Sequence, residues 1–97
     1  MDEALATAVL DVGGRPYAVL DIPFRAERIG ALPTQLVEHA LEAFARTSGT
    51  TLHLRASGRN DHHVAEASFK ALGRALRVAV AADPRRPGAA STKGSLG

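Results

Sequence analysis

The residues best suited to chemistry are four histidines in a chain of 97 residues that contains no cysteine. Two of them are adjacent in the segment DHHVAE, residues 61–66. On a helix, His62 and Glu66 are four positions apart and share one face, so together they can bind one metal ion. His63 is turned by roughly 100° about the helix axis and would face a second ion. The segment therefore predicts contributions to two metal sites.

A second explanation of the histidine pair is that it only caps and solvates the start of a helix, and the spacing leaves this alternative open. Upstream, His39 and Glu42 repeat the HxxE spacing, which is also common on an ordinary polar helix surface. If these side chains do bind a metal, they offer imidazole and carboxylate without thiolate. That donor set favours Mn²⁺ and is compatible with Fe²⁺, Co²⁺ or Zn²⁺.

Two further groups are suited to an anion. Lys70 lies one helical turn after Glu66, where it can pair with that carboxylate or meet an anionic substrate. Near the end of the chain, Ser91, Thr92 and Lys93 offer hydroxyls and an ammonium that bind phosphate if this segment folds over a site. Without such a site, the segment is an exposed end.

Composition excludes several classes of function. The formal charge is +2 and the pI is near 9.7, but the arginines are spread along the chain among acidic residues, so no basic patch predicts nucleic-acid binding. No run of about eighteen apolar residues predicts a membrane span. The start Met1-Asp2-Glu3 is acidic where a signal peptide is basic. We expect a cytoplasmic protein.

Strands and a helix must position these residues. Residues 4–12 and 15–22 have the composition of strands, and Gly13-Gly14 between them predicts a hairpin. A helix is predicted to begin with Thr34 as its cap and to end at Ser48-Gly49. Its apolar residues recur at three- and four-residue spacing: Leu36, Val37, Ala40, Leu41 and Phe44.

A third strand and a second helix follow. In residues 51–55, Leu52 and Leu54 alternate with His53, so we expect His53 to point away from the apolar face and not to bind metal. A turn over residues 58–61 can cap a helix from about residue 62 to 82. Its predicted apolar face contains Ala65, Phe69, Leu72, Leu76 and Val80. The predicted order is ββαβα, an α+β fold with a sheet packed on two helices.

Three strands and two helices make a poorly closed domain, because one side of the sheet and one side of the helix pair lack cover. We therefore interpret residues 1–83 as a half-domain that another copy or another chain completes. Residues 84–97, PRRPGAASTKGSLG, are rich in proline, glycine and serine and are expected to form a flexible tail.

Long stretches of the chain resemble one known family. The segments LPTQLVEHALEAFA, TLHLRASGRNDHHVAEASFKALGRALR and STKGSLG are similar to the second half of imidazoleglycerol-phosphate dehydratases, and MDEALATAVLDVGGRPY resembles the start of that half. The resemblance implies a ribosomal protein S5 domain 2-like fold, in which two similar halves pack their helices between two sheets. It also implies that metal sites form where subunits of a large assembly meet.

The same resemblance implies roles for individual residues. His62 and Glu66 match the pair that binds one manganese ion, whereas His39 and His63 match ligands that complete sites shared with the partner half. Lys70 matches a phosphate-binding residue.

Other roles follow from the same resemblance. The segment Ser91, Thr92 and Lys93 also matches phosphate-binding residues. Arg59 and Asp61 are expected to fix the loop or to orient His62. The reaction also requires a carboxylate that transfers protons, and Asp2 and Glu3 are the candidates by position.

The implied activity is that of a metal-dependent carbon–oxygen lyase in histidine biosynthesis, which dehydrates imidazole glycerol phosphate to imidazole acetol phosphate with two Mn²⁺ sites shared between chains or halves. This chain lacks the first half, so three alternatives stay open. It is a fragment that works with a first-half chain, a half-enzyme that assembles with its own copies, or a non-catalytic metal-binding assembly module derived from the family.

Overall fold

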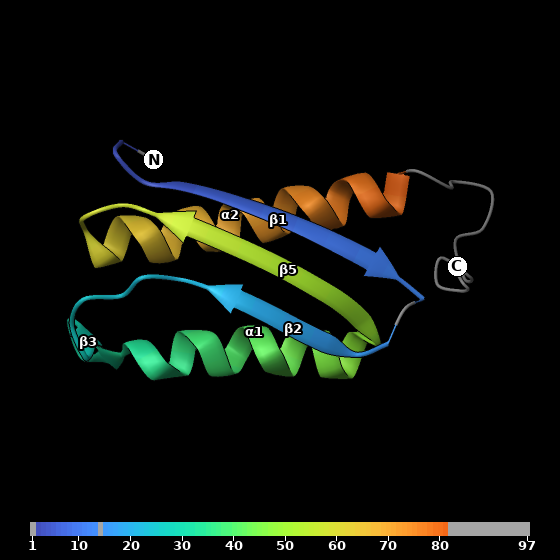
Figure 1. Ribbon diagram of the computed structural model, residues 1–97, viewed down its shortest axis with the longest axis horizontal. Helices are drawn as coiled ribbons and strands as arrows, with labels where there is room; N and C mark the ends of the chain where they lie inside the picture. The colour runs from blue at the N-terminus through green and yellow to red at the C-terminus, as the bar shows by residue number, and fades with distance from the viewer. Residues whose placement is uncertain (1, 14, 82–97) are drawn as a thin grey trace.

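The sheet is built around a central strand that comes late in the sequence. In the computed structural model, which describes residues 2–13 and 15–81, strands β1 (Leu5–Val12), β2 (Tyr17–Asp21) and β5 (Thr50–Ser57) form a sheet of order β1-β5-β2. β5 runs antiparallel to β1 and parallel to β2 (Figure 1). In this register, His53 of β5 lies opposite Val9 and Val19.

The predicted hairpin of the first two strands is wrong. Gly13 does make a turn, with a φ of 87°, but β5 lies between β1 and β2. The reason is burial: Leu52 and Leu54 of β5 are 0% and 2% exposed, and a central strand can bury such residues while both of its edges are hydrogen-bonded. A glycine turn indicates that the chain reverses direction. It does not indicate which strands are hydrogen-bonded to each other.

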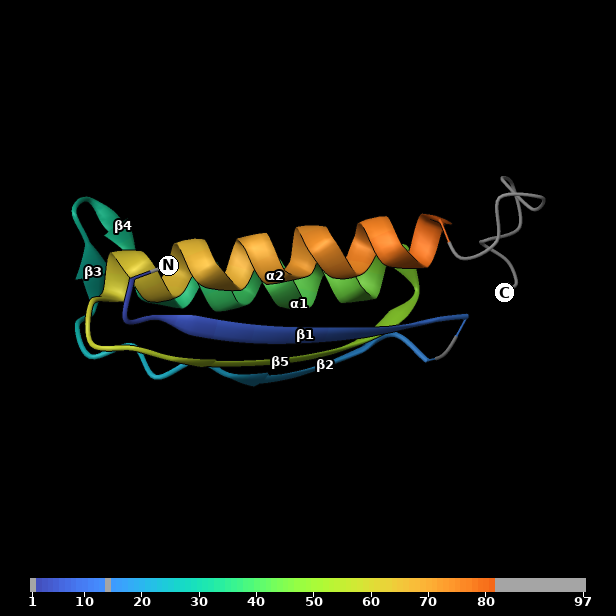
Figure 2. The same ribbon diagram turned by 90° about the horizontal axis from the view of Figure 1, so that it is seen from above.

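Two helices, α1 (Thr34–Ser48) and α2 (Asp61–Ala81), cover the same face of the sheet (Figure 2). Gly49 ends α1 as predicted, with a φ of 69° and its amide bound to the carbonyl of Ala45. The prediction that Thr34 caps α1 is wrong. Thr34 is the first helical residue, and its hydroxyl donates to the carbonyls of Ala26 and Glu27 at 2.9 and 3.2 Å.

The connection from β2 to α1 contains two short strands that the sequence did not predict. β3 (Arg28–Ile29) and β4 (Leu32–Pro33) pair antiparallel around Gly30, whose φ is 61°. Strands of two residues carry too little alternation to be recognised in a sequence. They precede α1 directly and so fix its first residue.

The core lies between the helices and the sheet, and α2 is rotated relative to its predicted apolar face, whereas Val37 and Leu41 of α1 are buried as predicted. On α2, Phe69 and Val80 are 45% and 66% exposed, whereas Val64, Ala67 and Ser68 are buried. Small residues let the helix approach the sheet, and the hydroxyl of Ser68 donates to the carbonyl of Val64 at 2.8 Å, which satisfies it inside the core. The buried hydrophobic residues are Ala4, Ile22, Val37, Leu41, Ala45, Leu52, Leu54, Ala56, Val64, Ala67 and Leu72.

Two apolar surfaces of the described chain have no cover, as the sequence predicted. On the sheet face opposite the helices, Leu5, Val9 and Tyr17 are 70%, 59% and 64% exposed. Large apolar residues on the helices are exposed as well: Leu36, Phe69, Val78 and Val80. Neither helix in residues 2–81 combines the length and the apolar character that crossing a membrane requires.

Candidate metal centre

The histidine pair is held in place by the start of α2. The side-chain carbonyl of Asn60 accepts a hydrogen bond from the backbone N–H of His63 at 3.1 Å, and its backbone carbonyl accepts from Val64 at 2.9 Å. Asn60 is therefore the N-cap, which confirms the prediction that the turn caps this helix. His62 and His63 both lie in the first helical turn.

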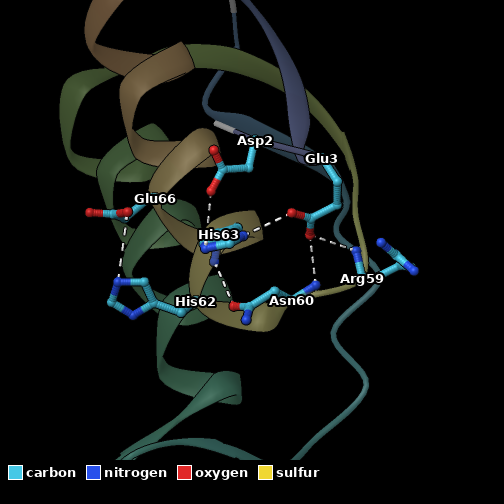
Figure 3. A network of polar contacts seen from close by, with 7 residues as sticks. All are labelled: Asp2, Glu3, Arg59, Asn60, His62, His63 and Glu66. Atoms are coloured by element: carbon cyan, nitrogen blue, oxygen red, sulfur yellow. Dashed lines mark hydrogen bonds and ion pairs between the residues drawn. The ribbon is translucent and has the colours of Figure 1, made fainter.

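His62 and Glu66 face the same side of α2, as their spacing predicts. Nε2 of His62 lies 3.7 Å from Oε1 of Glu66 (Figure 3). The side chains are 65% and 42% exposed, so both are accessible to an ion and to a second chain. A nitrogen and a carboxylate oxygen at this separation can bind the same divalent cation after a small change of rotamer.

His63 points away from His62 and toward the residues that precede β1. The two rings are 6.4 Å apart between centroids and inclined by 71°. Nδ1 of His63 lies 2.8 Å from Oε1 of Glu3, and Nε2 lies 3.6 Å from Oδ2 of Asp2 (Figure 3). The two histidines of the motif therefore point in different directions, as their helical spacing indicates.

Glu3 is the most strongly perturbed acid among the described residues. Its hydrogen bond with His63, followed by the bonds from the backbone N–H groups of Asn60 and Arg59, lowers its pKa to about 2 from an ordinary value of 4.5. Glu3 is therefore a carboxylate over the whole range in which proteins are usually studied, and it accepts every hydrogen bond that it makes.

Asp61 fixes a loop. Its carboxylate accepts hydrogen bonds from the backbone N–H groups of Arg25 at 3.0 Å and Ala26 at 2.9 Å. Loop fixing was one of the two roles expected for Asp61, and within the described residues its carboxylate makes no bond to the ring of His62. The sequence did not predict the partners of Asp61, because they lie 36 and 35 positions away in a segment without regular structure.

The remaining predicted residues are separate from this cluster. His39 is exposed on α1, and His53 points away from the core on β5, as predicted. Within residues 2–13 and 15–81, no group of three or more His, Asp or Glu side chains could hold a metal ion. The tail, with Ser91, Thr92 and Lys93, lies outside the described residues.

Lys70 lines a small pocket of about 140 Å³ between the start of β1 and α2. Arg74, one turn further along α2, lines the same pocket and was not singled out from the sequence. In the described chain, Glu66 lies 3.7 Å from His62, and Lys70 forms no ion pair. The pairing of Lys70 with Glu66, one of the two roles that its position allowed, is therefore not seen. Lys70 and Arg74 line the same opening.

The fold and the site define a class of protein: an α+β half-domain of the ribosomal protein S5 domain 2-like type that carries a His-His-x-x-Glu helix. Residues 1–76 match the family model for imidazoleglycerol-phosphate dehydratase, and the chain belongs to this family.

Relatives of that name are similar over almost the whole chain. The proteins of Clostridium botulinum strain Langeland and Moorella thermoacetica are 54% and 55% identical over 97 residues, which is 99% of this chain and 50% of each relative. The crystal structure of imidazoleglycerol-phosphate dehydratase from Staphylococcus aureus N315 is similar with a TM-score of 0.75 and 42% identity, over 78% of this chain and 45% of that chain. The chain thus spans about half the length of these relatives.

Proposed function

We propose that this chain is one half of an imidazoleglycerol-phosphate dehydratase, a lyase that removes water from imidazole glycerol phosphate to give imidazole acetol phosphate. The observation that carries the proposal is the pair of His62 and Glu66 on one face of α2 in a member of that family. The chain covers half of its relatives, so we infer that the other half completes the active site.

The donor set fits a divalent metal ion such as Mn²⁺, because the available side chains are imidazoles and carboxylates without thiolate. We assign His62 and Glu66 to one ion, and His63 and His39 to sites whose other ligands come from a partner half or another copy. The lack of a three-ligand group among the described residues agrees with sites shared between chains. A bound metal would polarise the imidazole ring of the substrate as a Lewis acid.

Residues of this chain also fit the other end of the substrate. Lys70 is exposed and free of an ion pair within the described residues, and it lines a pocket together with Arg74. A compact ammonium in this setting suits a phosphate group. We assign phosphate binding to Lys70 and, by resemblance to the family, to Ser91, Thr92 and Lys93.

Asp2 and Glu3 are the carboxylates nearest to His63, and we assign the proton transfers of the dehydration to one member of this pair. The exposed apolar residues provide the surface for association. Leu36 and Phe69 on the helices and Val9 on the sheet would leave water when a second half or a second copy binds.

The experiment that tests the proposal is turnover by reconstitution. The purified chain is mixed with the complementary half of the Moorella thermoacetica relative in the presence of Mn²⁺, and the formation of imidazole acetol phosphate is measured. We expect turnover from the mixture. His62→Ala and Glu66→Gln should abolish it, whereas Glu27→Gln, a matched change at an exposed carboxylate outside the site, should not.

The outcomes separate the alternatives. Turnover by this chain alone would identify a half-enzyme that assembles with its own copies. Mn²⁺ binding by the mixture without turnover would support the non-catalytic assembly module. A mixture that neither binds Mn²⁺ nor forms product would overturn the proposed function.

A further inference from the structure

Both carboxylate oxygens of Glu3 form hydrogen bonds with the segment at the start of α2. Oε1 lies 2.8 Å from Nδ1 of His63, and Oε2 accepts hydrogen bonds from the backbone N–H groups of Arg59 and Asn60, each at 2.9 Å. The side chain is only 26% exposed. One carboxylate thus connects the turn before β1, the N-cap of α2 and one imidazole ring.

This arrangement determines which nitrogen of His63 carries the proton. A carboxylate only accepts hydrogen bonds, so Nδ1 of the neutral ring must be the donor, and Nε2 keeps its lone pair. A metal ion binds the nitrogen with the free lone pair, and a carboxylate behind the ring fixes the ring's tautomer and orientation. We propose that Glu3 is a positioning residue that holds His63 as the Nδ1–H tautomer and so makes Nε2 the metal-binding atom; this rests on the proposed function.

The same geometry separates the roles of the two neighbouring carboxylates. Oδ2 of Asp2 lies 3.6 Å from Nε2 of His63, and the Asp2 side chain is 74% exposed. Adjacent residues of an extended strand point to opposite sides, but Asp2 has a φ of 47°, and this turn brings both carboxylates to one ring. Glu3 is fully hydrogen-bonded behind the ring, so Asp2 is the carboxylate left at the metal-facing nitrogen to exchange protons with a substrate.

A close packing contact holds the backbone donors against Glu3. Gly58 has a φ of 155°, and a Cβ atom at this position would lie 2.9 Å from both Ala4 Cβ and Val64 Cγ2. Only a residue without a side chain lets the segment that follows β5 pass between Ala4 and the first turn of α2. The N–H groups of Arg59 and Asn60 thereby reach Oε2.

A purely structural role for Glu3, as a clamp on the turn, would affect stability and leave the histidine tautomer unchanged. The tautomer is therefore the discriminating readout. It can be measured on the metal-free chain by long-range ¹⁵N–¹H correlation NMR of labelled histidines at about pH 8.5, well above the ordinary histidine pKa of about 6.5. His53, which is exposed on β5, provides an internal reference for an unconstrained ring.

We expect His63 in the wild-type chain to be the Nδ1–H tautomer, whereas His53 should show the excess of Nε2–H that free imidazole side chains have. Glu3→Gln should convert His63 to the Nε2–H tautomer. The Gln carbonyl can keep the two backbone donors, and its NH₂ group then donates to Nδ1 and moves the proton to Nε2. Glu3→Ala should give His63 the same ratio of the two tautomers as His53. A wild-type His63 in the Nε2–H form, or an unchanged His63 in Glu3→Gln, would overturn the proposal.

A second readout connects the tautomer to the metal. In the protein reconstituted with the complementary half, Glu3→Gln should weaken Mn²⁺ binding about 10- to 100-fold, with Glu27→Gln as the unaffected control. An unchanged Mn²⁺ affinity despite a reversed tautomer would overturn the positioning role. If the wild type shows the Nδ1–H tautomer but the reconstituted protein binds no Mn²⁺, the proposed function fails, and the inference that depends on it falls too.

Discussion

Nε2 of His62 and Oε1 of Glu66 lie 3.7 Å apart on the surface of α2, with no third metal-binding side chain beside them in the described part of the chain. Two ligands on one helix bind a divalent ion weakly, because the tetrahedral or octahedral shell stays at least half open. Under the proposed function, another chain would supply the remaining ligands around this pair.

The acid stability of the chain should depend on Glu3. Its pKa in the folded chain is lowered to about 2, from 4.5 ordinarily, so between these values the unfolded chain binds a proton that the folded chain does not. The stabilisation by Glu3 is complete above about pH 4.5 and is lost as the pH falls toward 2. Urea denaturation across this range should show a smaller pH dependence for Glu3→Gln than for the wild type. Equal slopes for both, with Glu27→Gln as control, would contradict the assignment.

The burial of one leucine of α1 and the exposure of another predict how alanine at each position changes the free energy of unfolding. Leu41 is 1% exposed and Leu36 is 53% exposed on the same helix. Leu41→Ala removes buried methyl groups and leaves a cavity, so the free energy of unfolding should fall by about 2–5 kcal/mol. Leu36→Ala should change it by no more than about 0.5 kcal/mol in the isolated chain. Chemical denaturation of both variants measures the difference, and similar losses would mean that α1 packs on another face.

Replacing either of two glycines with alanine should change the stability of the chain, in opposite directions at the two positions. Gly58→Ala places a Cβ 2.9 Å from Ala4 and Val64 and should destabilise the chain by about 1–3 kcal/mol. Gly73 lies inside α2, where an added methyl group would meet nothing within 4 Å, so Gly73→Ala should stabilise the chain by about 0.5–1 kcal/mol. Thermal denaturation of the two variants measures both changes in stability. A tolerated Gly58→Ala would show that the segment after β5 is not tightly packed.

Local patterns in the sequence were sufficient for the elements that carry the site. The spacing of His62 and Glu66 predicted their shared face, Ser48-Gly49 predicted the end of α1, and the alternation around His53 predicted its outward direction. Each of these depends on residues within a few positions of one another. Such relationships follow directly from helical and strand geometry.

Features that depend on distant residues could not be read in this way. The hairpin of β1 and β2 was wrong because β5, which follows α1 in the chain, lies between them. The face of α2 was shifted because buried Ala67 and Ser68 are small and are not conspicuous as core residues. Glu3 was recognised as a candidate acid, but its bonds to residues 59, 60 and 63 join segments 56 to 60 positions apart. Only the tertiary structure reveals that it is fixed behind His63.

Whether a metal site is completed between chains can be decided by measuring Mn²⁺ binding and association in the same samples. Electron paramagnetic resonance reports free and bound Mn²⁺, and sedimentation velocity reports the size of the species. We expect that tightly bound Mn²⁺ occurs only in assemblies, with the complementary half or with further copies, and that His62→Ala removes it. Tight Mn²⁺ binding by a chain that stays monomeric, or binding that survives His62→Ala, would rule out a site completed between chains.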